Sequence, residues 1–250
     1  MDKLYEQTRA WMQSQLDVLV SSIAPPRRVR LRDGIAYRYF EKTPQQAVVQ
    51  QLARTISGLR ASSLLLAHDL LQEQIAVCRM VNEFEDDITF LTLASMQDPQ
   101  PDILTRYLEA FYAEETSLQQ LESGERVKGR NLVSRKDIAK FLAKVSQDAK
   151  GSFEQSNTQL GLSFALSGYV HGASGHIMEM YEPTSGRFVT DRWVDHPLRE
   201  DHEHDIWNYY YRGILAVVFA AACIGQADVN TSAKRYIEYF KATSGSRVDF

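Results

Sequence analysis

The chain has 250 residues, of which 44% are hydrophobic and 24% are charged, as in an ordinary globular protein with a sizeable core. Its 28 basic and 32 acidic residues give a formal net charge of −4, which argues against a general attraction to nucleic acid or to an anionic membrane. The two cysteines, Cys78 and Cys223, are too few for a disulfide framework, and we expect both to be buried.

The N-terminal part combines one helix with a basic and aromatic connector. Apolar residues at helical spacing predict a helix over residues 2–24, which Pro25–Pro26 ends. Residues 27–43 are first basic and then aromatic, with Asp33–Gly34 between the two parts, and this pattern predicts a turn or a short hairpin. The connector contains a local basic patch made of Arg27, Arg28, Arg30 and Arg32.

The rest of the chain has helical periodicity almost throughout. Pro44 suits the first position of a helix that reaches about Ser57, and an apolar stripe predicts the strongest helix over about 61–94. Further helices are expected over about 102–122, 134–150, 153–181, 202–225 and 228–242, with an irregular loop at 183–197. The sequence therefore predicts an all-α fold, a bundle of about seven or eight helices.

We expect one helical domain over residues 1–250, in which residues 44–250 form the core of the bundle and residues 1–43 precede it. The longest apolar run, Ile214–Ile224, is far shorter than the ~20 residues that span a bilayer. The N-terminal segment also lacks the apolar core of a signal peptide. These features predict a cytoplasmic protein without a membrane partner.

Glycine, serine and histidine are concentrated in residues 163–176, within a predicted helix. Each helical glycine costs about 1 kcal/mol relative to alanine, so several glycines imply the close approach of another backbone or of a ligand. Either a tight helix crossing explains the segment, or the bare backbone admits a ligand to Ser167, His171 and His176. The two histidines lie about 140° apart on a regular helix and cannot share a metal ion. We expect no metal and no cofactor.

Two other clusters combine charged side chains. Residues 191–205 are rich in Asp, Glu and His, as an acidic helix start would be. Within them, Arg199 and His204 match the Arg-x(4–6)-His pattern of HEPN-type ribonucleases, although Glu200 follows the arginine where that family usually has Asn, Asp or His. The resemblance implies that Arg199 holds phosphate and that His204 exchanges protons.

The other cluster belongs to the helix predicted over 61–94 and consists of Arg79, Glu83, Asp86 and Asp87. Arg79 and Glu83 are spaced to pair as i and i+4. The cluster is interpreted as a face of solvated or interhelical salt bridges. A ferritin-like di-iron site is not expected, because the chain has no Glu-x-x-His motif.

Two segments together resemble the DUF5677-type domains, an uncharacterised family of bacterial all-helical proteins. The first is Arg79-Met80-Val81-Asn82-Glu83 followed by Ile88-Thr89-Phe90-Leu91, and the second is Ser167-Gly168-Tyr169-Val170-His171-Gly172. The resemblance covers roughly residues 50–225. It implies a helical fold that is distantly HEPN-like, and it suggests that His171 lies near Arg79 and Glu83.

Two functional hypotheses follow. The first is a helical binding or scaffold protein, a homodimer or other homo-oligomer, whose ligand is held by Arg79, Glu83, Ser167, His171 and His176. The alternative is a HEPN-like, metal-independent ribonuclease of a defence or toxin system, with Arg199 and His204 as the catalytic pair. The partner would be an RNA or another protein.

Overall fold

The computed structural model describes residues 2–31, 34–113, 133–148, 166–191 and 193–245, and these are predominantly helical, as predicted. Seven helices of ten residues or more lie in these ranges: α1 Asp2–Ser21, α2 Pro44–Ala67, α3 Leu71–Ser95, α4 Asp102–Phe111, α6 Arg135–Asp148, α9 Arg199–Ile224 and α10 Ala227–Ser244. The short helix α8 spans Ser174–Met178. Two antiparallel hairpins complete the described elements, β1 Arg27–Leu31 with β2 Gly34–Arg38 and β3 Tyr181–Glu182 with β4 Arg187–Phe188.

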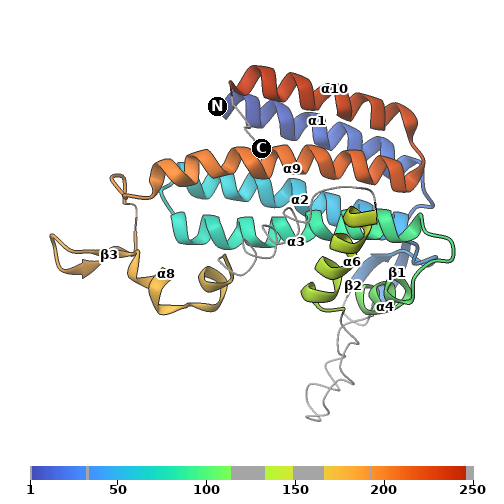
Figure 1. Cartoon of the computed structure of the whole chain (residues 1–250), viewed down its shortest axis with the longest axis horizontal. Helices are drawn as coiled ribbons and strands as arrows, with labels where there is room; N and C mark the ends of the chain where they lie inside the picture. Colours follow the sequence, from blue (N-terminus) through green and yellow to red (C-terminus); the bar gives the residue numbers. More distant parts are fainter. Residues whose placement is uncertain (1, 32–33, 114–132, 149–165, 192, 246–250) are drawn as a thin grey trace, which may run out of the picture.

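Five long helices run side by side in the bundle (Figure 1). Helix α9 packs against α1, α2, α3 and α10, so it is the central helix. Its apolar run explains this position, because Ile214, Val217 and Ala220 are fully buried. Helices α4 and α6 lie on the α3 side of the bundle. None of the described helices is both long and apolar enough to cross a bilayer.

The predicted start of α2 is confirmed at Pro44, and the residues around it explain why. Thr43 is the N-cap, and its side chain accepts a hydrogen bond from the backbone N–H of Gln46. The Gln46 side chain accepts in return from the backbone N–H of Thr43. This capping box satisfies two backbone donors at the helix start.

The predicted end of this helix near Ser57 is wrong, because α2 continues to Ala67 and the chain turns at residues 68–70. Gly58 lies inside α2 at its crossing with α3, where a Cβ atom would overlap Cγ2 of Val81. The absence of a side chain at Gly58 therefore allows α2 and α3 to pack closely at this position. The turn is made instead at Asp69, whose φ of 59° is in the left-handed region that Asp tolerates.

The prediction of one helix over 153–181 is also wrong for the residues that the structure describes. Residues 166–171 are helical, but Gly172 has a φ of 66° and ends that helix before α8 begins. The β3–β4 hairpin then occupies part of the expected irregular loop. Residues 153–165 lie outside the described ranges, as does most of the expected helix beyond α4.

Gly58 provides a test of the α2–α3 crossing. We expect Gly58→Leu to lower the free energy of unfolding by about 1–3 kcal/mol, because overpacking a crossing displaces α3. Val81→Ala in the same chain should restore part of the loss. Urea unfolding measures both, with Gly175→Leu as a control because a Cβ atom at Gly175 meets no atom within 4 Å. Equal stability of the Gly58 and Gly175 variants would contradict the crossing.

Candidate functional site

The predicted ligand residues lie on two parts of the molecule. Arg79 and Glu83 are on α3 and form the expected ion pair, with Nη1 of Arg79 2.6 Å from Oε1 of Glu83. Ser167, His171 and His176 belong to the segment over residues 166–198, here called the appendage, which extends past the start of α3 (Figure 1).

The space beside Gly168 is filled by a side chain of the appendage itself. A Cβ atom at Gly168 would lie 2.7 Å from Cε1 of His176, so the glycine leaves room for this imidazole. The ring also meets Tyr169 edge-on, with 4.1 Å between the ring centroids. The atoms nearest to a Cβ at Gly168 thus belong to a side chain of the same segment and not to another helix, as a tight helix crossing would require. His176 fills this space.

The appendage is held to the start of α3 by hydrogen bonds. Nε2 of Gln72 donates to the carbonyl of His176 (2.9 Å) and to Oε2 of Glu179 (3.1 Å), which also accepts from the hydroxyl of Tyr169. His171 is exposed. Gln72 precedes Arg79 by about two helical turns. The predicted proximity of His171 to Arg79 and Glu83 stays a prediction.

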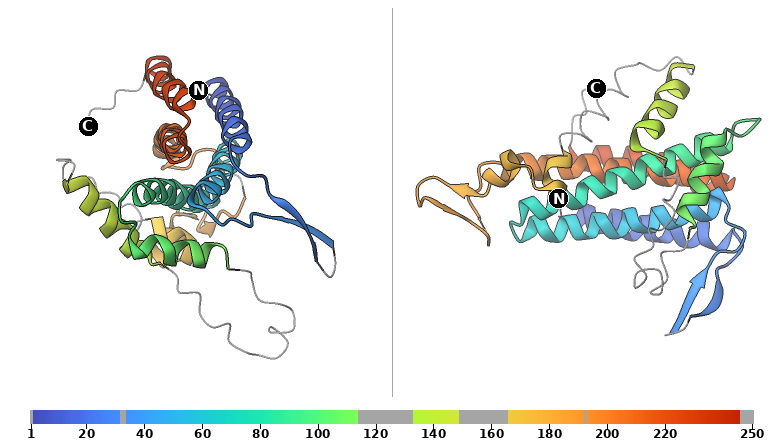
Figure 2. Two further views of the ribbon diagram at one scale, coloured as in Figure 1. Left: turned by 90° about the vertical axis from the view of Figure 1, so that its right-hand side faces the viewer. Right: turned by 90° about the horizontal axis from the view of Figure 1, so that it is seen from below.

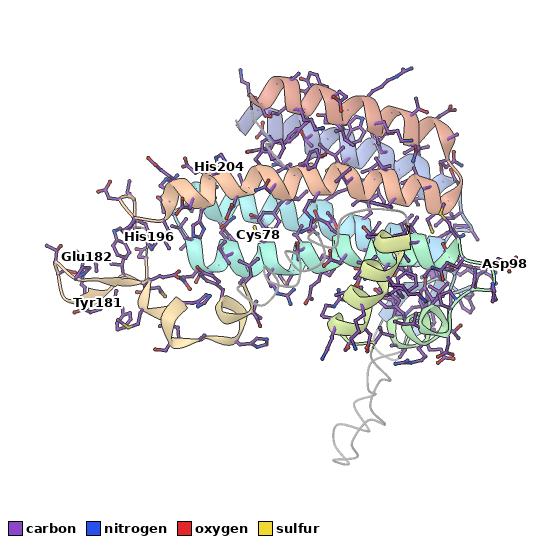
Figure 3. The ribbon with its side chains drawn as sticks, viewed as in Figure 1. Cys78, Asp98, Tyr181, Glu182, His196 and His204 are labelled. Atoms are coloured by element: carbon purple, nitrogen blue, oxygen red, sulfur yellow. The ribbon has the colours of Figure 1, made fainter. Side chains whose placement is uncertain are left out.

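Arg199, the first residue of α9, lies where α9 meets the α2–α3 turn. Its guanidinium forms ion pairs with the buried carboxylate of Asp69 and with Glu203, the latter at 2.9 Å. The pair with Asp69 fixes the start of α9 to the α2–α3 turn. His204 is exposed on α9, and His196 lies beside the β3–β4 hairpin (Figure 3). The Arg199 guanidinium, to which the HEPN resemblance assigns phosphate binding, is thus paired with two carboxylates.

A second histidine on α9, His202, belongs to the run rich in Asp, Glu and His over residues 191–205, and its side chain is buried. Oε1 of Gln74 accepts a hydrogen bond from its Nδ1 atom (2.8 Å). The Gln74 amide donates in turn to Ser62 and to Cys78, which lies on α3 (Figure 3). Burial disfavours the imidazolium and lowers the pKa of His202 to about 4. The imidazole is therefore neutral at physiological pH, and this chain joins α2, α3 and α9 inside the core.

The carboxylates in the middle of α3 form a charged cluster with arginines from two other helices. Arg212 of α9 lies 3.3 Å from Glu85 and 2.9 Å from Asp86, and it also bonds to Asn82. Arg135 of α6 lies 2.6 Å from Asp87. The interpretation of this acidic run as an interhelical salt-bridge face is confirmed for these contacts.

Burial dominates the electrostatics of the α3 charged cluster. It raises the pKa of Glu85 to about 8 and that of Asp87 to about 6, against the attraction of Arg212 and Arg135 respectively. Neither oxygen of Glu85 has a hydrogen-bond partner among the described residues. Burial therefore favours the protonated form of Glu85. Perturbed carboxyl groups of this kind mark functional sites in some proteins and structural networks in others.

No group of three or more His, Cys, Asp or Glu side chains in the described ranges is arranged to hold a metal ion. A surface groove of about 540 Å³ lies between α1 and α10, away from these clusters. It is lined by Trp11, Asp228, Thr231, Ser232, Arg235, Tyr236 and Tyr239.

The hairpin predicted within residues 27–43 is confirmed, and its register separates two faces. Arg28 pairs with Tyr37 and Arg30 pairs with Ile35 across the strands, so these four side chains share one face, here called the outer face. All four are exposed. Both views of Figure 2 show the ribbon projecting from the helices.

The base of the hairpin, unlike its outer face, contacts neighbouring residues. Arg27 pairs with Glu41 at 2.8 Å and its guanidinium lies 5.1 Å from the centroid of the Phe40 ring. Tyr39 packs against the core. Arg32, the last member of the predicted basic patch, lies outside the described residues. The hairpin is thus anchored at its base and presents its outer face to solvent.

Comparisons of the chain with protein-family models, with curated proteins and with solved structures find no match. The DUF5677-type resemblance and the HEPN-like function that it implies therefore stay predictions. The functional argument depends on the geometry of the described residues.

The raised pKa of Glu85 predicts a specific pH dependence of stability. The unfolded chain releases this proton near pH 4.5 and the folded protein near pH 8. The stabilisation from this proton is therefore complete below about pH 4.5 and is lost as the pH rises to about 8. Glu85→Gln cannot titrate, so its stability relative to wild type should increase across this range.

Urea unfolding of both proteins at several pH values measures this difference. Glu73→Gln is the matched control, because Glu73 is an exposed carboxylate on the same helix. Parallel pH profiles for wild type and Glu85→Gln would show that Glu85 is charged in the folded protein.

Proposed function

We propose that the protein is a helical binding protein whose partner is a nucleic acid, held by the outer face of the β1–β2 hairpin. The observation that carries this proposal is the pairing of Arg28 with Tyr37 and of Arg30 with Ile35 on one exposed face. Guanidinium groups bind phosphate oxygens, and an aromatic ring offers a stacking surface to a base. The two arginines stand about 7 Å apart along β1, which suits contacts with neighbouring phosphates.

The distribution of charge supports the same proposal. Residues 27–42 contain six basic and two acidic residues, a net charge of +4, so the rest of the chain carries −8. An anionic polymer is therefore attracted to the hairpin and repelled by the bundle. Such an arrangement directs a ligand to one element even when the whole protein is acidic.

An acidic protein segment is the main competing partner, because it too would pair with arginine. The exposed ring of Tyr37 beside Arg28 favours a nucleic acid, which alternates anionic groups with flat bases. We do not extend the proposal to RNA cleavage. The Arg199 guanidinium is already paired with Asp69 and Glu203, and no observation favours its transfer to a phosphate.

The proposal predicts that loss of the two outer arginines weakens binding. We expect Arg28→Ala/Arg30→Ala to lower the affinity for a labelled RNA or DNA at least about tenfold at low salt. The slope of log K against log salt should become shallower by about one to two, because two phosphate contacts are lost. Fluorescence anisotropy at several salt concentrations measures both quantities.

The matched control is Arg60→Ala/Arg235→Ala, which removes the same charge from exposed positions on α2 and α10. Its affinity should stay near that of wild type. Equal losses in both double variants would mean that net charge alone governs binding, and an unchanged affinity of the hairpin variant would refute the proposed site.

A further inference from the structure

The geometry of the hairpin points to single-stranded nucleic acid as its ligand, with one base stacked on Tyr37. This inference rests on the proposed function and specifies the ligand of that same site. Three features of the hairpin carry it: the small number of available cations, the exposure of the tyrosine ring, and the shape of the ribbon.

Few cations of the described hairpin are available to phosphates. Arg27 is paired with Glu41 and lies over Phe40, while Nη1 of Arg38 donates to the carbonyl of Tyr37. The side chains of Arg28 and Arg30 have no hydrogen bond or ion pair with any residue that the structure describes. Two phosphate contacts give weak, shallowly salt-dependent binding, so useful affinity requires a further, uncharged contact.

Tyr37 can supply that contact. The residue is 65% exposed, and no ring contact joins Tyr37 to another aromatic residue among those that the structure describes. Arg28 lies directly across the ribbon, and Ile35, which is 53% exposed, lies two residues before it on the same face. A base can therefore stack on the ring while the phosphate beside it meets the guanidinium of Arg28.

Base pairing and stacking decide which nucleic acid fits this face. In a duplex each base is covered by its neighbours, whereas the bases of a single strand can unstack and lie on an aromatic ring. The deep, narrow major groove of duplex RNA does not admit side chains, so a two-stranded ribbon cannot read it. The major groove of duplex DNA does admit such a ribbon. Duplex DNA is therefore the competitor that an experiment must separate.

The experiment compares three probes on the full chain: a labelled 12-nucleotide oligo(U), a DNA duplex of equal length, and inorganic polyphosphate as an anion without bases. We expect wild type to bind the single strand at least about tenfold more tightly than either other probe. Tyr37→Leu should lower the affinity for the single strand by about 5- to 100-fold, since stacking on one ring is removed. Its affinity for the other two probes should change little. Tyr37→Phe should retain binding.

Tyr239→Leu, on α10, is the control for loss of an exposed tyrosine, and thermal unfolding confirms that each variant folds. Equal affinity for the duplex, or an unchanged Tyr37→Leu variant, would overturn the single-strand inference while leaving nucleic-acid binding intact. Polyphosphate that binds as tightly as the oligonucleotide would overturn both the single-strand inference and the proposed nucleic-acid partner. Failure of all three probes to bind would overturn the proposed function itself.

Discussion

The close packing of α9 against α1 and α2 at Gly213 is the contact on which the arrangement of the bundle depends. A Cβ atom at this position would lie 2.9 Å from Cδ1 of Leu59 on α2 and 3.1 Å from Cε of Met12 on α1. The absence of a side chain lets both neighbours reach the backbone of α9, and the resulting burial of apolar surface drives association of the helices. The other long helices are placed relative to this one.

Polar contacts define the position of α9 in ways that apolar packing alone does not. Arg199 fixes its start to the α2–α3 turn through Asp69, and Arg212 fixes its middle to the acidic run of α3. Burying charged groups is costly, so such contacts add less stability than their number suggests. Each arginine meets particular carboxylates, however, and a shift of α9 by one turn would separate Arg199 from Asp69 and Arg212 from Asp86. We infer that these pairs set the register of α9.

The sequence was sufficient to predict the features that depend on local chemistry. Pro44 and the apolar periodicity indicate the start of α2 and the all-α fold, and the basic and aromatic run indicates the hairpin. Features that depend on a distant partner were not predictable. Gly58 marks a crossing because Val81 packs there, and the sequence offers no signal for that contact.

The candidate sites follow the same division. The ion pair of Arg79 with Glu83 follows from spacing along one helix, whereas the engagement of Arg199 by Asp69 joins residues far apart in the chain. The patch of arginines near residue 30 was evident in the sequence. Only the structure shows which of these arginines pair with other residues and which can contact a ligand. Its strand register places Arg28 and Tyr37 on one face.

The β1–β2 hairpin and the appendage lie at opposite ends of the long axis of the bundle (Figure 1). Helix α9 alone has 26 residues and so spans about 40 Å between them. Two macromolecules of modest size, one at each end, would not collide. The helices thus separate the hairpin, which we propose to hold a single strand, from the exposed apolar side chains of the appendage, Val170, Ile177 and Met178.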